Sequence, residues 1–207
     1  MDKPILPACY LPPVSYFATV LRWKDTGVYI EQQEHFPKQT YRNRASIYGA
    51  NGPLDLIIPV KKARSAGRTK MKEVQISYEA DWQRLHWLSL QTAYRSSAYF
   101  EYYEDEFEAF YRQQYPLLMV YNLELTRLIL RLLKIETSLT LTEVYQPDYP
   151  EELDFRERIH PKNRVHASSA TYHQVFADRH GFLPDLSIVD LLFNQGPQLT
   201  EFLADHG

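Results

Sequence analysis

The hydrophobic pattern of this chain changes its period near residue 80, which restricts the chain to a fold that mixes strands and helices. Before residue 80, every second residue is apolar in 54–60 and in 74–78, a period of two that is typical of half-buried strands. After residue 80, apolar side chains recur at three- and four-residue steps, as in amphipathic helices. We therefore expect a mixed α/β fold, leaning to α+β. In it, a small sheet from the N-terminal third packs on a helical middle, followed by short C-terminal helices.

Two further segments of the N-terminal third have strand character, residues 28–30 and residues 41–48. The turn-forming sequence Asn51-Gly52-Pro53 separates 41–48 from 54–60, so these two segments are expected to pair as a hairpin. The pattern does not determine the order of the strands or whether they run parallel.

Three helices are expected in the middle of the chain. Asp81 suits the N-cap of a helix from Trp82 to about Arg95. An aromatic stripe follows in residues 99–114, and Pro116 suits the first position of a third helix. The apolar face of that third helix is the clearest helical pattern in the chain, with Leu118, Tyr121, Leu125, Leu128, Ile129 and Leu132.

Two short helices are expected near the C-terminus. Thr171 suits the cap of a helix that ends before Gly181, and Ser187 with Asp190 resembles a capping box for a second. The chain has 207 residues, a length that suits a single domain over residues 1–207. Its expected parts are a strand-rich part (1–80), a helical part (81–135), an extended arm (136–170) and the C-terminal helices (171–207).

Composition excludes several classes of protein. A net charge of −3 disfavours a general nucleic-acid binder. Cys9 is the only cysteine, so the chain can form neither an intramolecular disulfide nor a thiolate metal cluster. The N-terminus lacks a secretory signal pattern, and no apolar run has the length of a membrane span. We therefore expect a cytoplasmic protein without a membrane span.

The segment KQTYRNR, residues 38–44, is rich in hydrogen-bonding groups. If 41–48 is a strand, Arg42 and Arg44 lie on one face of it, about 7 Å apart by the strand rise. That separation suits an anion such as a diphosphate or a pair of carboxylates. The alternative is that both arginines are solvated strand residues and that Asn43 forms a turn or backbone hydrogen bond.

A second basic run lies between two predicted strands and could close over an anionic ligand as a lid. Its alternative role is a solvated loop that protects a sheet edge. The basic residues of this run are Lys61, Lys62, Arg64, Arg68, Lys70 and Lys72. The first four are the candidates for the lid.

Two polar residues stand out on the helices. Asn122 shares the apolar face of the third helix, so its amide is expected to face inward and to bond to a ligand or to a backbone turn. His86 could transfer protons or contact a ligand, or it could be a packing residue with satisfied hydrogen bonds. The sequence contains no metal-ligand spacing, no phosphate-binding glycine loop and no nucleophile elbow, so it predicts neither a metal nor a cofactor.

Six blocks, in order along most of the chain, resemble the WbqC-like family. They are YLPPVSYF (10–17), FPKQTYRNR (36–44), LIIPVKK (56–62), WQRLHWLSLQTAYRSSAYFEYY (82–103), LLMVYNLEL (117–125) and GFLPDLSIVDLLFNQGP (181–197). The family usually has Gln-Pro before the first block and Gly before its Tyr-Phe pair. This chain has Pro7-Ala8 and Ser15 at those places, so no catalytic role is assigned there.

The resemblance implies a binding site at the matching polar positions. With Tyr41 added from the same segment, the expected substrate-binding residues are Lys38, Gln39, Tyr41, Arg42, Asn43, Arg44, Tyr94 and Asn122, and His86 is the expected catalytic residue. The family name comes from bacterial O-antigen gene clusters, which implies biosynthesis or modification of surface polysaccharide precursors. Those precursors usually carry a diphosphate, which agrees with an anionic small-molecule substrate.

The reaction itself is left open by the sequence. One hypothesis is an enzyme of group transfer, a transferase acting on a substrate similar to a nucleotide sugar. The second is a non-catalytic binding or scaffold protein of cell-envelope assembly, with the tyrosines and the 136–170 arm as an interface. A third, binding of structured RNA, is disfavoured by the net charge. Whether the chain forms a homo-oligomer is likewise open.

Overall fold

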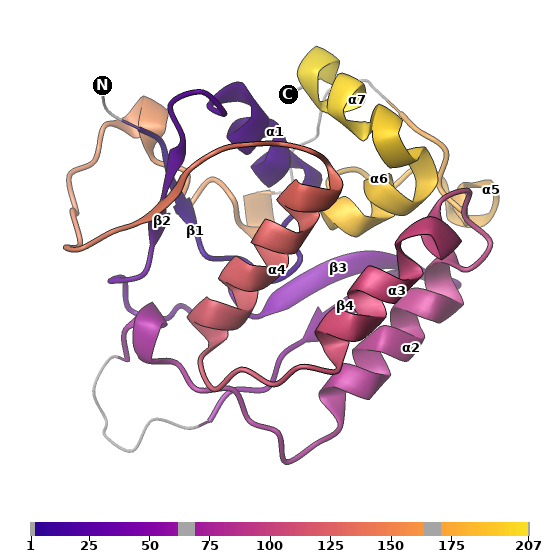
Figure 1. The fold of residues 1–207 in the computed structure, drawn as a ribbon, viewed down its shortest axis with the longest axis horizontal. Helices are drawn as coiled ribbons and strands as arrows, with labels where there is room; N and C mark the ends of the chain where they lie inside the picture. Colours follow the sequence, from indigo (N-terminus) through magenta and orange to yellow (C-terminus); the bar gives the residue numbers. More distant parts are fainter. Residues whose placement is uncertain (1–2, 62–68, 164–170, 207) are drawn as a thin grey trace.

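The structure is a computed structural model that describes residues 3–61, 69–163 and 171–206. Two small sheets lie among α-helices and short 3-10 helices (Figure 1). The α-helices are α1 (Val14–Arg22), α2 (Trp82–Tyr94), α3 (Phe100–Tyr111), α4 (Leu118–Leu132), α5 (Ala177–His180), α6 (Ile188–Gln195) and α7 (Leu199–His206). The 3-10 helices are η1 (Met71–Glu73), η2 (Glu151–Leu153), η3 (Pro161–Asn163) and η4 (Gly196–Gln198). The mixed α/β class predicted from the sequence is confirmed.

One sheet is parallel, with the strand order β1 (Ile5–Pro7), β2 (Val28–Glu31) and β5 (Leu139–Leu141). Parallel neighbours need a long crossover, and α1 supplies the one between β1 and β2. The strand β5 comes from the segment expected to be an extended arm. The expectation that the sheet comes only from the N-terminal third is therefore wrong.

The second sheet is the predicted hairpin, in which β3 (Arg44–Gly49) pairs antiparallel with β4 (Gly52–Ile57). Gly52 has φ 101°, a conformation that favours glycine, so it fits the turn between the strands. The first strand begins at Arg44 and not at residue 41, and the second strand ends at Ile57 and not at residue 60. These shifts change which side chains share a face near residue 42.

The predicted strand at 74–78 does not form. Val74 and Ile76 are buried, but the segment makes only isolated bridges, Val60 with Ile76 and Gln75 with Leu117. The second bridge also explains the start of α4: the amide of Leu118 donates to the carbonyl of Val74, so the residues just before the helix are extended. Pro116 had been expected to be the first residue of this helix. The helix instead begins at Leu118.

The middle helices α2, α3 and α4 agree with the sequence pattern to within a few residues. The C-terminal part agrees less well. Thr171 does not cap a helix, because α5 begins only at Ala177. Ser187 caps α6 as expected, and its hydroxyl accepts from the amide of Val189. The helices α1 and α7 had not been predicted.

The helix α6 is the centre of the aromatic core. Phe193 lies 5.3 Å from Tyr94, 5.1 Å from Phe100 and 5.3 Å from Phe107, measured between ring centroids. A helix that is apolar on nearly all sides is normally buried, and this one packs against α3 and the hairpin. The C-terminal segment is thus part of the core.

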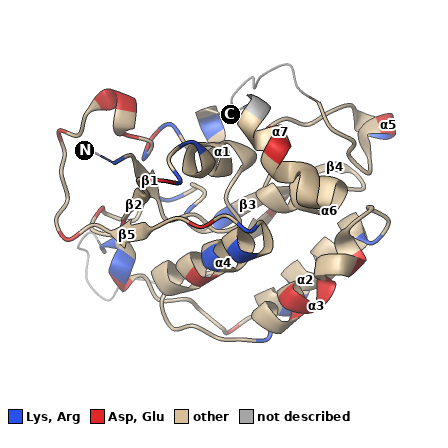
Figure 2. Cartoon of the chain, turned by 45° about the horizontal axis from the view of Figure 1, so that its top comes forward, with Lys and Arg blue, Asp and Glu red and all other residues tan. Residues whose placement is uncertain are grey.

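Charged residues lie on the outer faces of the helices, with acidic residues along α3 and basic residues on α4 (Figure 2). The two helices are joined by an ion pair in which Nη2 of Arg131 lies 2.8 Å from Oε2 of Glu106. Within the described ranges, no helix combines the length and the apolar character needed to cross a bilayer.

Candidate functional site

Arg42 is the largest fully buried polar side chain of the described structure, and Glu34 holds it in place. Its Nε donates to Oε1 of Glu34 at 3.0 Å, and its Nη2 donates to Oε2 at 2.9 Å. Nη2 also donates to the backbone carbonyl of Arg156 at 3.0 Å. Burial raises the pKa of Glu34, although the Arg42 guanidinium acts in the opposite direction. The pair is a bidentate ion pair in a dry environment.

The expectation that Arg42 and Arg44 project together from one strand face is wrong. Arg42 precedes β3 in a turn, and only Arg44 belongs to the strand. Arg44 is partly exposed and pairs with Asp55 on the neighbouring strand, with 3.3 Å between Nη1 and Oδ2. The two guanidiniums bind different carboxylates, one inside the protein and one at its surface, so they do not form a common anion site.

Asn122 faces inward as predicted, and it binds two backbone carbonyls. Its Nδ2 donates to Ala8 at 3.0 Å and to Arg42 at 2.7 Å. The side chain therefore ties α4 to the segment after β1 and to the turn that carries Arg42. Of the two roles considered for Asn122, a bond to a ligand or a bond to a backbone turn, these hydrogen bonds show the second.

Among the side chains of Glu34, Arg42 and Asn122, two atoms have no hydrogen-bond partner within the described residues. They are Nη1 of Arg42 and Oδ1 of Asn122, both buried. We call Glu34, Arg42 and Asn122 the inner polar cluster. Buried polar groups are nearly always satisfied, so an unpaired donor and an unpaired acceptor on hydrogen-bonded neighbours call for a water molecule or a ligand group.

His86 lies on α2 in an aromatic environment. Its Nδ1 is 2.9 Å from the hydroxyl of Tyr10, which is in turn 2.5 Å from the hydroxyl of Tyr111. The ring of Trp82 packs against the imidazole with 5.1 Å between centroids. Burial lowers the pKa of His86 to about 4, and the carbonyl of Ile57 offsets only part of this effect. The imidazole is therefore neutral at pH 7.

Tyr94 belongs to a different network, centred on Asp190. Its hydroxyl donates to Oδ1 of Asp190 at 2.8 Å, while the hydroxyl of Tyr172 and the amide of Gln174 donate to Oδ2 at 2.6 and 2.9 Å. Burial raises the pKa of Asp190, against the effect of these donors. Asp190 therefore does not complete the expected capping box with Ser187. It ties the C-terminal tail to α2.

The remaining predicted positions lie near the surface or within the turn. Lys38 and Gln39 are exposed, and Gln39 has φ 60°, which is uncommon for a residue other than glycine. Asn43 donates from Nδ2 to the carbonyl of Ile58 at 2.9 Å, and Tyr41 is buried.

The proposed lid is only partly covered by the structure. Lys61 is exposed. Lys62, Arg64 and Arg68 lie outside the described residues.

A second buried arginine, Arg156, was missed by the sequence analysis. Its Nε and Nη2 donate to the two carboxylate oxygens of Asp154 at 2.9 and 2.6 Å, and its Nη1 lies 3.5 Å from Oε2 of Glu31. Because Arg42 also donates to the backbone carbonyl of Arg156, the two ion pairs form one buried network. The charged residues of the 136–170 segment carried no periodic pattern that could have revealed it.

No group of three or more His, Cys, Asp or Glu side chains in the described part of the chain is arranged to hold a metal ion. Cys9 is fully buried, and burial raises its pKa to about 12. Its thiol is therefore protonated at neutral pH and lacks the nucleophilicity of a thiolate.

Comparisons with known proteins give one family and one relative. Residues 8–160 match the model of a family described as the WbqC-like protein family. The chain is also similar to a protein of Mycobacterium tuberculosis (strain ATCC 25618 / H37Rv) described as "Uncharacterized protein Rv1507c". The two are 24% identical over 230 residues, which cover 96% of each chain. No solved structure matches the chain significantly.

Proposed function

The chain belongs to the WbqC-like protein family, and on that premise we propose that it acts on a phosphate-bearing precursor of a bacterial surface polysaccharide. Group transfer is the proposed class of reaction. The origin of the family name in O-antigen gene clusters supports the type of precursor. The inner polar cluster supports a phosphate-bearing substrate, because Nη1 of Arg42 is a hydrogen-bond donor without a partner among the described residues.

The observation that carries the proposal is the unpaired Nη1 of Arg42. Glu34 occupies Nε and Nη2, which fixes the plane of the guanidinium and leaves Nη1 as the group that can bind a further oxygen. A preorganised, desolvated donor binds an anionic oxygen more strongly than a solvated one does. Arg42 would thus bind a single phosphate oxygen, and Arg44 would have no part in binding.

Two neighbours of Arg42 extend the binding site. Oδ1 of Asn122 has no partner among the described residues and would accept from a hydroxyl of the substrate. Lys38 is exposed four residues before Arg42 and would attract the anion from solution.

His86 is the proposed proton-transfer group. Its imidazole is neutral at pH 7, as a general base requires, and the hydroxyls of Tyr10 and Tyr111 continue the chain of hydrogen bonds that begins at Nδ1. Its pKa of about 4 makes it a weak base. The proposed transfer therefore relies on the position of the ring more than on its basicity.

Titration calorimetry with UDP-glucose, GDP-mannose and inorganic pyrophosphate tests the proposal. The wild type should bind at least one of these probes. Arg42→Lys should lose most of that binding, because an ammonium group cannot both pair with Glu34 in a bidentate manner and donate to a ligand. Arg44→Ala is the matched control and should bind as the wild type does.

Three results would contradict the proposal: no binding by the wild type, equal binding by Arg42→Lys, or a loss of binding in Arg44→Ala. Urea unfolding of each variant checks that it is folded. Should Arg42→Lys fail to fold, Lys38→Ala takes its place. It alters only an exposed side chain, and it should weaken binding at low ionic strength.

The second candidate function is binding without catalysis in envelope assembly, and exposed leucines on α2 favour it. Leu85 is 56% exposed and Leu88 is 43% exposed, three residues apart on one helix. Light scattering of the purified wild type and of Leu85→Ser plus Leu88→Ser tests this candidate. A monomeric wild type with the same solubility as the variant would count against it.

A further inference from the structure

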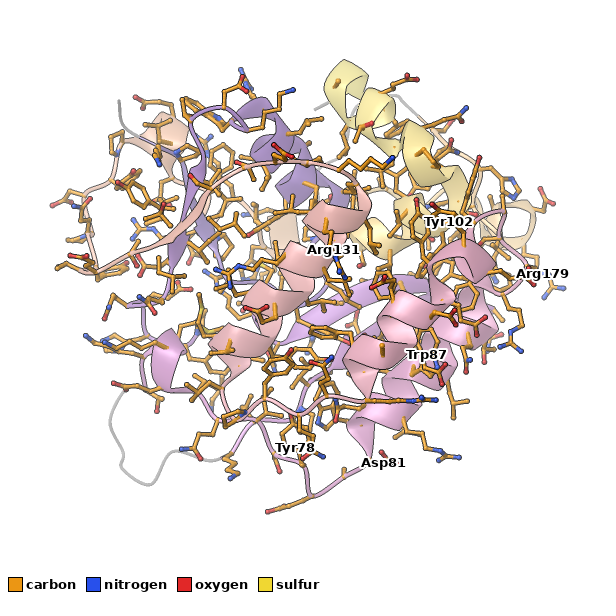
Figure 3. The ribbon with its side chains drawn as sticks, viewed as in Figure 1. Tyr78, Asp81, Trp87, Tyr102, Arg131 and Arg179 are labelled. Carbon is orange, nitrogen blue, oxygen red and sulfur yellow. The ribbon has the colours of Figure 1, made fainter. Side chains whose placement is uncertain are left out.

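An open groove of about 620 Å³ lies between the ends of α1 and α4 and the starts of α3 and α7. Its lining combines buried apolar residues, such as Leu133 and Ile135, with exposed polar residues, which we call the rim. The rim residues used below are Lys24, Asp25, Tyr102, Lys134 and Glu136. Figure 3 labels Tyr102 at the first turn of α3 and Arg131 in the last turn of α4. None of these residues belongs to the inner polar cluster.

The groove continues along Arg127, Leu130 and Arg131 of α4 and along the linker that follows the helix. A second cavity of about 850 Å³ shares Lys134, Ile135 and Glu136 with the first and extends along the linker to Leu139. Because the shared residues line both spaces, one elongated ligand could pass over them. A small compact ion would fill only a small part of this path.

The charges of the rim balance. Lys24 and Lys134 provide two cations, Asp25 and Glu136 provide two anions, and none of the four forms an ion pair with another described residue. A site for a diphosphate would need an excess of cations. Four unpaired groups of both signs instead supply hydrogen-bond donors and acceptors to an uncharged ligand with many hydroxyl groups.

Tyr102 provides an aromatic platform at one end of the groove. Tyr102 is 77% exposed, more than any other large hydrophobic residue in the described part of the chain. The ring is held at 88° to the buried ring of Tyr103, with 4.8 Å between centroids. An exposed aromatic face offers apolar contact to a flat ligand ring, and its hydroxyl offers a hydrogen bond.

Lys134 has a backbone conformation that favours glycine. It follows the last turn of α4 with φ 55°, and the amide of Ile135 donates to the carbonyl of Leu130 at 2.9 Å, as in a Schellman motif. A side chain at this position is unfavourable for folding alone. Strained positions of this kind are concentrated at functional sites.

We propose that this groove binds an uncharged oligosaccharide, with a sugar ring against Tyr102 and its hydroxyl groups bound by Lys24, Asp25, Lys134 and Glu136. The site goes beyond the proposed function, because it lies apart from Arg42 and recognises a different chemical class. Sugar rings combine apolar faces with many hydroxyl groups, and the groove offers the complement of both.

Saturation-transfer NMR and titration calorimetry with uncharged trisaccharides of glucose, galactose, rhamnose and N-acetylglucosamine test the proposal. The wild type should bind at least one of them. Tyr102→Ala should weaken that binding roughly tenfold through the loss of the ring contact, and Glu136→Gln should weaken it less. Leu54→Ala, an exposed apolar truncation on β4, is the matched control and should bind as the wild type does.

Failure of this site can be distinguished from failure of the Arg42 site. Arg42→Lys should leave trisaccharide binding unchanged, and Tyr102→Ala should leave the binding of pyrophosphate unchanged. The proposal is overturned if no trisaccharide binds to the wild type, or if Tyr102→Ala binds as well as the wild type does. It is also overturned if pyrophosphate competes for the groove and Lys24→Ala abolishes that competition.

Discussion

Replacement of His86 by glutamine should change how the stability of the protein depends on pH. The imidazole has a pKa of about 4 in the folded protein and about 6.5 in the unfolded chain. Between these values the unfolded chain binds the proton more tightly. His86 therefore contributes stability that is fully present above about pH 6.5 and is lost as the pH falls toward about 4.

The magnitude follows from the difference of the two pKa values. Each pKa unit corresponds to about 1.4 kcal/mol, so the whole effect is about 3 kcal/mol, of which about 2 kcal/mol falls between pH 7 and pH 5. Glu34 and Asp190 have raised pKa values and act in the opposite direction. They are present in both proteins, so their contribution cancels when the variant is compared with the wild type.

The assay is urea unfolding at pH 7 and pH 5, followed by tryptophan fluorescence. Glutamine can still bond to the hydroxyl of Tyr10, so His86→Gln is expected to fold. The wild type should lose about 2 kcal/mol more than the variant between the two pH values. Replacement of the exposed His180 by glutamine is the control and should follow the wild type. Equal pH dependence of His86→Gln and the wild type would refute the reasoning that burial keeps His86 neutral.

Three further predictions concern charge and backbone conformation. Glu34→Gln should lower the free energy of unfolding in urea at pH 7 by about 3–5 kcal/mol, because it leaves Arg42 charged inside the protein. Arg44→Ala should lower it by at most about 1 kcal/mol. Equal losses in the two variants would show that burial does not make the Arg42 pair more important than the Arg44 pair. Lys134→Gly should raise the unfolding free energy by about 0.5–1 kcal/mol, because glycine adopts a positive φ without strain, and a loss of stability would contradict this reading of the turn. Asp190→Ala should lower the free energy of unfolding by about 3 kcal/mol, because three buried donors lose their acceptor. Near-UV circular dichroism on heating would detect the loosened tail. An unchanged melting curve would disprove the role of this network.

The local predictions that succeeded rest on short-range physics. Period-two alternation and a turn sequence were enough for the hairpin of β3 and β4, because adjacent strands need no distant partner. The apolar stripes were enough for α2, α3 and α4, and an amide on such a stripe was enough to place Asn122 inside. The parallel pairing of β2 with β5 was not predictable, because no local pattern records which distant segment lies beside a strand.

The sequence by itself determined the fold class, the middle helices, the hairpin and the resemblance to a family whose model matches residues 8–160. Only the tertiary structure decided that Arg42 pairs with Glu34 and Arg44 with Asp55. The physical reason is that only residues within a strand share its faces, and tertiary packing decides at which residue the strand begins. A shift of three residues at the beginning of β3 placed one arginine in the interior and left the other at the surface.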